Sequence, residues 1–489
     1  MIQTDILIVG AGITGTALSR ELSRYKASVL VIERGPDVAE GATKANSGIV
    51  HAGYDAVPGT NKAKYNVLGA SLYEDLCETL GVPYRKCGAL VIGFDEKDRS
   101  TLEHLYSRGV QNGVPGLSLL DHAEVLQKEP SVNPEVLCAL DVPESAIVSP
   151  YELAYALADD AAMNGVSFRF DQCLKTVRQR NDNIWEIETD SGELYACKAF
   201  VNCSGASGAM IHNMISGAEL KMTHRRGQYY LLDRTADLPF SRTIFQCPSP
   251  MGKGVLVSPT VHGNLLIGPN AEDINDGFDT STTACGLSEV ISKAVRTWPG
   301  LSTRTNITNF AGVRAHLDTD DFMIGPVNGA VGAFEAIGIE SPGLSSAPAI
   351  ARELSSIIAS YLSLQKKDDV LSFPSSVRTF REMNDEERQQ AVRDNPLYGN
   401  IVCRCETVTE AEIINAIHRP VGARTIDGVK RRCRAGMGRC QGGFCSPRVA
   451  QIIADETGIP LSEVTKDGGE SRILTGTIES FLKGGGFHD

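Results

Sequence analysis

The sequence has no run of about eighteen or more apolar residues, so we expect no transmembrane segment. It begins with Met1–Asp5 directly before an apolar stretch, without the basic segment or small-residue cleavage site of a secretion signal, which predicts a cytoplasmic protein. Internal repeats and low-complexity tracts are also absent. Basic residues are outnumbered by acidic ones, 47 against 60, and the net charge of −13 argues against nucleic acid as a partner.

The composition is that of folded domains, with 42% hydrophobic and 22% charged residues, which excludes a wholly disordered or fibrous chain. At roughly 100–200 residues per domain, a length of 489 residues predicts about two to four domains. The 13 cysteines are unevenly spread. Those between Cys77 and Cys285 are scattered and predict reduced thiols, whereas five fall between Cys403 and Cys445. This late cluster indicates a metal site rather than a disulfide framework.

The N-terminal residues have the pattern of a dinucleotide-binding unit. A short β-branched strand is followed by a glycine-rich turn, a helical stretch and a second buried strand that ends at Glu33. Gly10 allows the tight turn, Gly12 lets the backbone approach a pyrophosphate, and Gly15 permits close helix–strand packing. The N–H groups of the helix N-terminus bind phosphate, and the Glu33 carboxylate accepts ribose hydroxyls. The unit predicts a dinucleotide cofactor, with FAD and NAD as alternatives.

Three later segments resemble the flavin-binding motifs of FAD-dependent enzymes related to glycerol-3-phosphate dehydrogenase and L-2-hydroxyglutarate oxidase. Residues 41–53 are similar to the segment that runs along the pyrophosphate and past the isoalloxazine ring. Residues 199–206 are similar to the strand and turn that close over the FAD, and residues 338–344 to the C-terminal flavin motif. The resemblance implies FAD as the cofactor. The further FAD-contacting residues that it implies are Thr43, Asn46, Ser47, Gly205, Gly338, Gly343 and Leu344.

The third of these segments also has a physical interpretation. Ser341 is a good N-cap, Pro342 suits the first helical position, and a helical pattern continues to about Tyr361. A helix N-terminus aimed at the N1 and C2-carbonyl edge of a flavin would stabilise the negative charge of the reduced ring. The segment therefore predicts a helix that contributes directly to the flavin site.

The resemblance implies an α/β fold in which a Rossmann-like FAD-binding domain is interrupted by an inserted mixed-sheet α+β substrate domain. The FAD-binding domain is expected to comprise residues 1–90, 145–222 and 312–365. The substrate domain is expected to comprise residues 91–144 and 223–311. Residues 366–400 are charged and weakly apolar, which predicts a connector. A small helical [2Fe–2S] domain at 401–458 and a tail at 459–489 are expected to follow.

Candidate catalytic residues lie in the segments expected to face the flavin. Arg314 matches the family position whose guanidinium binds the phosphate or carboxylate of the substrate, a role suited to a permanently charged bidentate donor. Arg226 and Lys253 are weaker candidates, for which solvated or structural roles are the alternative. Oxidation of a secondary alcohol also needs a base, and histidine is the usual base near neutral pH. His51 is the first choice because its motif lies against the flavin, and His316 is the second, with structural roles as the alternative for both.

Four of the late cysteines form two short pairs, Cys403 with Cys405 and Cys440 with Cys445, so that two loops can each present two sulfurs. With the sequence RAGMGRCQGG around Cys440, the pairs resemble the bacterioferritin-associated-ferredoxin-like [2Fe–2S] domain found in catalytic subunits of the anaerobic glycerol-3-phosphate dehydrogenase type. Zinc is the alternative, because four thiolates satisfy it equally well. A flavin in the same chain favours the iron–sulfur cluster as a one-electron relay. Cys433 is expected to be unligated.

Helices are expected around these cysteines. A capping box begins at Thr409, a second helical stretch begins at Thr425, and Ser446 starts a helix whose N-terminus would face the cluster. Basic residues would stabilise the negative charge of an iron–sulfur cluster, with a solvated helical face as the alternative for Arg431 or Arg432. The basic residues concerned are Arg424, Lys430, Arg431, Arg432, Arg434 and Arg439.

Together these features predict an FAD- and [2Fe–2S]-containing dehydrogenase for a small anionic 2-hydroxy compound, sn-glycerol 3-phosphate first and L-2-hydroxyglutarate second. Hydride would pass to flavin N5, and electrons would leave singly through the cluster to a partner, either a second flavoprotein or a quinone-linked membrane subunit. The rival hypotheses are an oxidase that reduces oxygen directly and an electron-transfer subunit without its own substrate. Attachment to the inner face of the membrane through the partner is the alternative to a purely cytoplasmic location.

Overall fold

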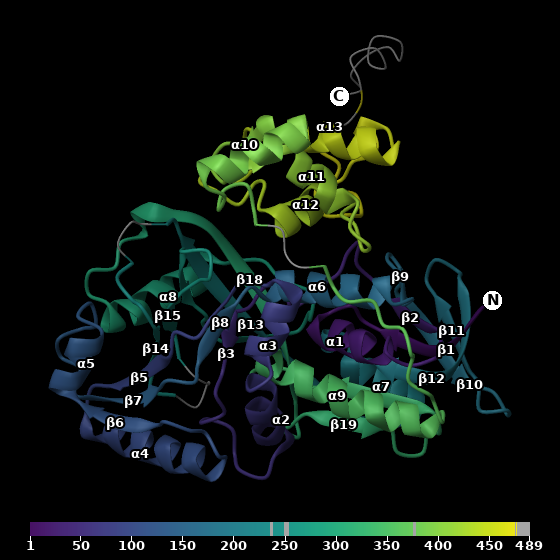
Figure 1. Cartoon of the computed structure of the whole chain (residues 1–489). Helices are drawn as coiled ribbons and strands as arrows, with labels where there is room; N and C mark the ends of the chain where they lie inside the picture. Colours follow the sequence, from purple (N-terminus) through teal and green to yellow (C-terminus); the bar gives the residue numbers. More distant parts are fainter. Residues whose placement is uncertain (235–237, 249–253, 375–377, 475, 477–489) are drawn as a thin grey trace, which may run out of the picture. The chain divides into compact units, whose positions relative to one another are not determined.

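The computed structural model divides into two compact units (Figure 1). The larger unit comprises Met1–Glu33 and Val38–Ser375, and the smaller comprises Arg34–Asp37 and Ser376–Asp489. No helix in the described part of the chain has both the length and the apolar composition to cross a membrane. The residues outside the description are 235–237, 249–253, 375–377, 475 and 477–489. Lys253, one of the weaker candidates for substrate binding, lies among them.

The first sheet of the larger unit is built on β1 (Ile2–Val9), whose second half is buried because it is a run of β-branched and leucine residues. β1 pairs in parallel with β2 (Val29–Ile32) on one side and with β12 (Leu194–Asn202) on the other. β9 (Ser167–Arg169) extends the parallel part beyond β2, and β20 (Ala333–Ile337) extends it beyond β12. Antiparallel strands complete the sheet: β10 (Leu174–Gln179), β11 (Trp185–Thr189) and β19 (Met323–Pro326).

Helices pack beside this sheet. α1 (Ile13–Leu22) packs against both α6 (Pro150–Met163) and α9 (Gly343–Tyr361), and α2 (Asn61–Ala70) packs against α9 (Figure 1). α9 ends at Tyr361 as predicted, but Ser341 as its N-cap is wrong. Pro342 is the N-cap, because its φ of −96° and ψ of 46° lie outside the helical region, and the helix begins at Gly343. The remaining helices here are α3 (Tyr73–Leu80) and α7 (Gly208–Ser216).

The second sheet of the larger unit is mixed, because β14 and β5 pair in parallel whereas the other neighbours are antiparallel. Its order is β17–β13–β16–β15–β14–β5–β7–β6, with β18 along the other side of β13. The bounds are β5 (Ala89–Gly93), β6 (Ser118–Asp121), β7 (Cys138–Val142), β13 (Met222–Leu232), β14 (Thr243–Gln246), β15 (Leu256–Pro259), β16 (Leu265–Gly268), β17 (Glu272–Ile274) and β18 (Asn306–Leu317). Its helices are α4 (Glu96–Gln111), α5 (His122–Lys128) and α8 (Ala284–Thr297).

A small antiparallel sheet of β3 (Ile49–Val50), β8 (Ala146–Val148) and β4 (Tyr84–Arg85) completes the larger unit. The two large sheets confirm the predicted α/β class with a mixed second sheet. The boundaries between the FAD-binding and substrate domains stay predictions, because both domains lie within one compact unit.

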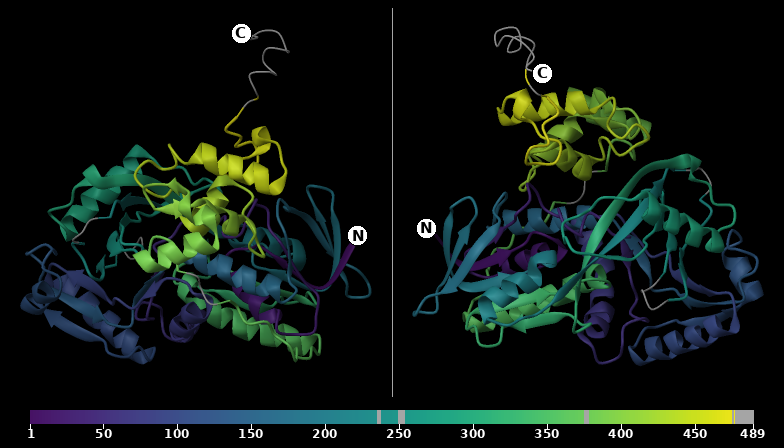
Figure 2. Two further views of the ribbon diagram at one scale, coloured as in Figure 1. Left: turned by 45° about the horizontal axis from the view of Figure 1, so that its top comes forward. Right: turned by 180° about the vertical axis from the view of Figure 1, so that it is seen from behind.

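The smaller unit is mainly helical (Figure 2). α11 (Glu410–Ile417) packs against α12 (Ile426–Cys433) and α13 (Ser446–Thr457) around a core of aliphatic side chains. The predicted capping box is confirmed, since the Thr409 hydroxyl accepts from the Glu412 N–H and the Glu412 carboxylate from the Thr409 N–H. Thr425 caps α12, as predicted. The other elements of this unit are α10 (Asp385–Asp394), β21 (Ile401–Cys403) and β22 (Val408–Thr409).

Candidate functional site

The turn between β1 and α1 and the first turn of α1 leave no room for a side chain at Gly10 or Gly15. Gly10 has a φ of +103°, and a Cβ there would lie 2.4 Å from the carbonyl oxygen of Cys203. A Cβ on Gly15 would lie 1.9 Å from the Gly10 carbonyl oxygen. The first turn of α1 is therefore held directly against the ends of β1 and β12, where only glycine fits.

Two side chains from other segments fix the N-terminus of α1. The Glu33 carboxylate accepts from the Ala11 N–H at 2.8 Å, and the Thr43 hydroxyl accepts from the Ile13 N–H at 2.9 Å. A Cβ on Gly12 would lie 3.2 Å from the Thr43 hydroxyl oxygen. The structure thus brings an acid, a hydroxyl and a side-chain-free helix N-terminus together, which is the donor and acceptor set that a dinucleotide pyrophosphate and ribose require.

Residues 41–53 lie between this turn and the start of α9. The Asn46 side chain shapes the segment, because its amide donates to the Thr43 carbonyl at 2.9 Å and accepts from the Gly48 N–H at 2.7 Å. The His51 N–H donates to the Ser345 hydroxyl at 2.7 Å, which joins the segment to the first turn of α9. Two segments predicted to hold the flavin are therefore in direct contact.

The glycines predicted around α9 and β12 occupy turns. Gly338 has a φ of +69°, and a Cβ there would lie 2.4 Å from Leu317 Cδ1. Gly205 has a φ of +57° at the start of a single 3₁₀ turn after β12. A Cβ on Gly343 would meet the Ile339 side chain at 2.6 Å, and the Leu344 carbonyl accepts from the Tyr73 hydroxyl. Direct contact of these residues with FAD stays a prediction.

One face of β18 packs against residues 41–53. A Cβ on Gly312 would lie 1.9 Å from the carbonyl oxygen of Ala45, and the Ser47 hydroxyl lies 3.5 Å from the Tyr229 hydroxyl on β13. Arg314 is two residues beyond Gly312, and therefore on the same face of the strand. Gly227 is the cross-strand partner of Gly312 and leaves space for the guanidinium of Arg314. A Cβ on Gly227 would lie 2.7 Å from Arg314 Nη2.

The Arg314 guanidinium contacts the Asn270 carbonyl at 3.4 Å, and no described carboxylate forms an ion pair with it. Arg226 differs, because its side chain donates to Asp279 at 2.6 Å and to Glu272 at 2.9 Å while the residue is only 4% exposed. This geometry favours the structural role for Arg226. Arg314 is the candidate cation that the structure leaves available to an anion beside the flavin segment.

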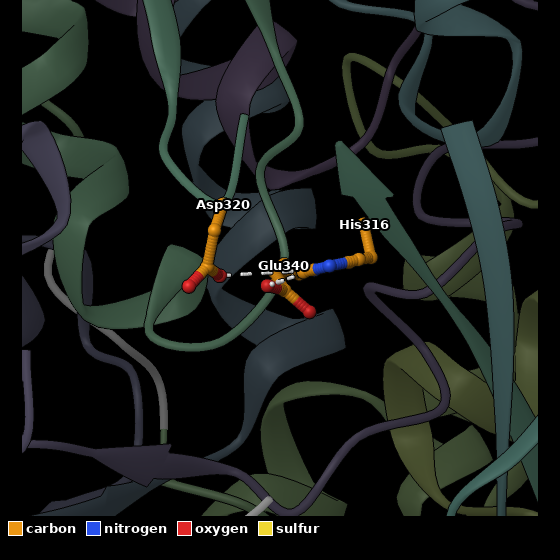
Figure 3. Close-up of side chains that lie close together, drawn as sticks. All are labelled: His316, Asp320 and Glu340. Carbon is orange, nitrogen blue, oxygen red and sulfur yellow. Dashed lines mark hydrogen bonds and ion pairs between the residues drawn. The ribbon is translucent and has the colours of Figure 1, made fainter. Parts of the chain in front are cut away.

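His316 is engaged in an ion-pair network (Figure 3). Its Nδ1 lies 2.9 Å from Glu340 Oε1 and 4.0 Å from Asp320 Oδ1. Lys62 Nζ lies 2.8 Å from Glu340 and 3.0 Å from Asp320, so one ammonium group already pairs with both carboxylates. Burial lowers the pKa of Lys62, but the carboxylates of Glu340 and Asp320 outweigh it and leave the pKa raised. His316 is thus held by carboxylate partners, which favours a structural role, whereas His51 lies in the predicted flavin segment, residues 41–53.

The four predicted cluster ligands gather at the ends of two loops of the smaller unit. Cys403 and Cys445 are buried, Cys405 is exposed, and the Cys405 and Cys440 sulfurs lie 3.8 Å apart. Such a separation suits two thiolates on one tetrahedral ion with bonds of about 2.3 Å. A hydrogen bond from Cys445, assisted by the backbone N–H groups of Gly436 and Glu406, lowers the pKa of Cys403 to about 6. The donor set therefore fits a thiolate-ligated cluster.

Cys433 is turned away from these four sulfurs. Its thiol donates to the Val429 carbonyl at 3.3 Å within α12, and burial raises its pKa to about 12. The nearby basic residues are not a solvated face: Arg431 pairs with Asp467 at 3.2 Å, and Arg432 pairs with Asp37 through two short contacts. The solvated alternative is wrong for both arginines, because each guanidinium is buried against a carboxylate within this unit.

Glu406 is a residue of this site that the sequence did not predict. This residue follows the ligand Cys405, is only 4% exposed, and pairs with Arg434 at 2.9 Å and Arg381 at 3.3 Å. An acidic residue directly after a Cys-x-Cys pair in a basic segment is the signal that could have revealed it. Glu406 is the buried negative charge closest in sequence to the cluster ligands.

Replacing Glu406 with glutamine should raise the midpoint potential of the cluster, because loss of a nearby negative charge favours the reduced state. The glutamine side chain keeps the shape needed to contact both arginines. An EPR-monitored potentiometric titration of the holoenzyme measures the shift. Glu410→Gln, which removes an ion pair with Arg448, is the control. A potential that is unchanged or lowered in Glu406→Gln would contradict this electrostatic role.

Replacing Gly15 with alanine should remove FAD from the purified protein, because the new Cβ cannot be accommodated beside Gly10. Overpacking of about 1–3 kcal/mol corresponds to roughly a fivefold to 150-fold loss of affinity. The ratio of flavin to protein absorbance after gel filtration measures the FAD that the protein retains. Gly41→Ala is the matched control in the flavin segment, since no atom lies within 4 Å of the added Cβ. Equal flavin content in both variants would refute the packing argument.

Comparison with known proteins identifies two family matches. Residues 5–357 match the family "FAD dependent oxidoreductase", and residues 401–455 match the family "BFD-like [2Fe-2S] binding domain". These matches support FAD and [2Fe–2S] as cofactors, and they favour the cluster over zinc at the four cysteines.

Individual relatives extend this picture. A glycerol 3-phosphate dehydrogenase of Caloramator mitchellensis is 45% identical over 97% of this chain and 99% of its own length. A glycerol 3-phosphate oxidase of Mycoplasma genitalium is 31% identical over 74% of this chain and 96% of its own. The solved structure of the FAD-bound, dithionite-reduced L-alpha-glycerophosphate oxidase from Mycoplasma pneumoniae is 30% identical, with a TM-score of 0.73 over 77% of this chain and 100% of its own.

Proposed function

This chain belongs to the FAD-dependent oxidoreductase family that includes glycerol 3-phosphate dehydrogenases and oxidases, and we propose that it oxidises sn-glycerol 3-phosphate to dihydroxyacetone phosphate. The observation that carries the proposal is Arg314 beside the flavin segment, which forms no ion pair with any carboxylate in the described part of the chain. When bound, FAD would supply a hydride acceptor at N5, and a [2Fe–2S] cluster held by Cys403, Cys405, Cys440 and Cys445 would supply a one-electron relay. The residues of this chain bind the anion, orient the alcohol and take its proton.

Arg314 would hold the phosphate of the substrate. The neighbouring carboxylates of β17 are already neutralised, because Asp273 pairs with Arg225 at 2.6 Å and Glu272 pairs with Arg226. Arg314 therefore keeps its positive charge available on the face that packs against residues 41–53. A guanidinium in such a partly buried position binds a phosphate through two parallel, charge-assisted hydrogen bonds.

His51 would accept the hydroxyl proton. Its backbone is fixed by the Ser345 hydroxyl, and its ring lies against the Phe245 ring with a centroid separation of 5.7 Å. These contacts restrict the imidazole to one region beside the flavin segment, as a general base requires. The first turn of α9 meets the same segment through Ser345, and a helix N-terminus close to the flavin would support negative charge developing there.

Replacing His51 with glutamine should lower kcat by about 10²–10⁴-fold, because a positioned general base contributes that much. It should also remove the acidic limb of the pH dependence of kcat/KM, since the base must be neutral to accept a proton. His316→Gln is the control: it perturbs an ion pair with Glu340 and should keep the acidic limb. Loss of that limb in His316→Gln rather than in His51→Gln would reverse the assignment.

Anaerobic flavin bleaching tests the substrate. The purified holoenzyme is mixed with sn-glycerol 3-phosphate, L-2-hydroxyglutarate, lactate or an amino acid, and absorbance of oxidised flavin is followed. We expect the fastest bleaching with sn-glycerol 3-phosphate. Faster bleaching by L-2-hydroxyglutarate would make this compound the substrate in place of sn-glycerol 3-phosphate. No bleaching by any compound would support an electron-transfer subunit without its own substrate. In a separate aerobic assay, hydrogen peroxide formed in proportion to the substrate consumed would indicate an oxidase.

The cluster implies an electron acceptor outside the chain. We propose either a second flavoprotein or a quinone-linked membrane subunit, with the enzyme in the cytoplasm or held at the inner face of the membrane by that subunit. Co-purification with the membrane fraction before and after a high-salt wash distinguishes the two locations.

A further inference from the structure

Two buried side chains bind the backbone of His51 on its two sides. The short strand β3 ends directly before this residue, and residues 51–53 belong to no helix or strand. The Ser345 hydroxyl accepts from the His51 N–H at 2.7 Å. In the orientation that satisfies both of its partners, the Asn66 amide donates to the His51 carbonyl at 2.8 Å and accepts from the Gly53 N–H at 3.0 Å. Side chains thus take the place of a strand ladder around this histidine.

The two side chains come from helices that pack directly against each other. Asn66 lies on α2, and Ser345 lies in the first turn of α9 (Figure 1). A Cβ on Gly69 of α2 would lie 2.0 Å from the Ser345 carbonyl oxygen, so the helices approach closely where glycine permits it. A Cβ on Gly53 would lie 2.5 Å from Val67 Cγ2, which places α2 against the histidine segment as well. The helix packing therefore fixes both side chains relative to this segment.

Bonds to both backbone groups of one residue fix the direction in which its side chain leaves the chain. The Cα–Cβ bond has a set orientation relative to the N–H and C=O groups of the same residue. In His51 the freedom that remains is rotation about the side-chain bonds, and the Phe245 ring at a centroid separation of 5.7 Å limits this rotation. Asn66 and Ser345 are both buried, so their hydrogen bonds to His51 are shielded from competition by water.

We propose that Asn66 and Ser345 are positioning residues that hold the His51 imidazole where it takes the hydroxyl proton of the substrate, an inference that rests on the proposed function. We call these two residues the His51 clamp. A general base must lie within hydrogen-bond reach of its proton, and a displacement of about 1 Å can lower a rate about 10²-fold. The clamp gives an irregular segment the rigidity of two packed helices, which a precisely placed base requires.

Asn66→Leu and Ser345→Ala test the clamp, because each removes hydrogen bonds to His51 with little change in side-chain volume. FAD-loaded enzyme is mixed anaerobically with increasing sn-glycerol 3-phosphate in a stopped-flow instrument, and flavin bleaching is followed. Each variant should lower the limiting rate constant by about tenfold or more. The apparent Kd of the substrate should stay unchanged, because Arg314 holds the phosphate. A merely structural role would lower thermal stability or FAD content and leave the rate constant of the loaded enzyme unchanged.

A double-mutant cycle shows whether the clamp acts through His51. In the His51→Gln background, neither Asn66→Leu nor Ser345→Ala should lower the limiting rate constant further, because the group that they position is gone. Hydrogen exchange followed by mass spectrometry gives a measurement without turnover. The backbone amides of residues 51–53 should exchange faster in both clamp variants than in the wild type.

Matched controls remove comparable hydrogen bonds that are made to neighbouring backbone rather than to His51. The Ser346 hydroxyl is also buried in α9 but donates to the Pro342 carbonyl at 3.0 Å, so Ser346→Ala should leave the limiting rate constant unchanged. Asn112 donates to the Gly53 carbonyl at 2.9 Å, and Asn112→Leu should likewise leave it unchanged.

Three results would overturn the clamp alone. The first is a wild-type limiting rate constant in both clamp variants while His51→Gln is slow. The second is further slowing by the clamp variants in the His51→Gln background, and the third is equal slowing in the two controls. A wild-type rate constant in His51→Gln would instead overturn the base assignment, and the role of the clamp with it. The compound that bleaches the flavin fastest serves as the substrate, so a different substrate leaves the test intact.

Discussion

Cys405→Ser should yield a protein that keeps its FAD and loses its iron and acid-labile sulfide. The serine hydroxyl is a poor ligand for iron. Because position 405 is exposed, packing would not hold the serine against the metal, and the cluster would be left with three thiolates. Flavin bleaching by sn-glycerol 3-phosphate should continue, because the flavin segments belong to the other compact unit. Turnover with a one-electron protein acceptor should fall to background.

The matched control for this variant is Cys433→Ala, which changes another sulfur of the same unit. Cys433 hydrogen bonds to Val429 within α12, so its removal should leave iron and sulfide at wild-type amounts. Metal and sulfide analyses with the visible and EPR spectra decide the outcome. Loss of the cluster in Cys433→Ala, or its retention in Cys405→Ser, would contradict the ligand assignment, and zinc without sulfide in the wild-type protein would contradict the cluster.

Arg314→Met should lower kcat/KM for sn-glycerol 3-phosphate by about 10²–10³-fold. Removing one partner of a partly buried, charge-assisted pair costs about 3–4 kcal/mol, and about 1.4 kcal/mol corresponds to a factor of ten. Arg314→Lys keeps the charge and loses the bidentate geometry, so its loss should be smaller. Steady-state kinetics with an artificial acceptor at saturating concentration measure both variants.

Two controls separate anion binding from misfolding in this experiment. Arg304→Met changes an exposed arginine just before β18 and should leave kcat/KM unchanged. Glycerol lacks the phosphate. With glycerol as substrate, the kcat/KM of the wild type divided by that of Arg314→Met should therefore approach one. An equal loss for both substrates would show that Arg314 supports the fold, and a loss under threefold for the phosphate would exclude it from the anion site.

The local parts of the site could be predicted from the sequence. Gly10 and Gly15 were predicted from the turn that they form, and the structure gives each a steric reason because a Cβ would collide with neighbouring backbone. The capping box at Thr409 and the cap at Thr425 were also predicted from short local patterns, and the structure shows the hydrogen bonds that form them. Each of these features depends on residues a few positions apart, which a short sequence pattern contains.

The parts that depend on distant residues could not be predicted in this way. The Glu406–Arg381 and Arg432–Asp37 pairs join residues far apart in the chain, so no spacing rule reveals them. The facing glycines Gly227 and Gly312 make room for Arg314 and Ala45 only because β13 and β18 pair in one register. Sequence therefore indicated which chemistry to expect, and the pairing of strands decided which arginine remained available for it.

Electrons from sn-glycerol 3-phosphate should reach the cluster of the same enzyme. Anaerobic titration of the holoenzyme with this substrate, followed by visible and EPR spectroscopy, measures whether they do. We expect that the flavin is bleached and that the EPR signal of a reduced [2Fe–2S] cluster then appears, with no added acceptor. A bleached flavin with a cluster that stays oxidised, although dithionite reduces it, would show that these electrons do not reach the cluster.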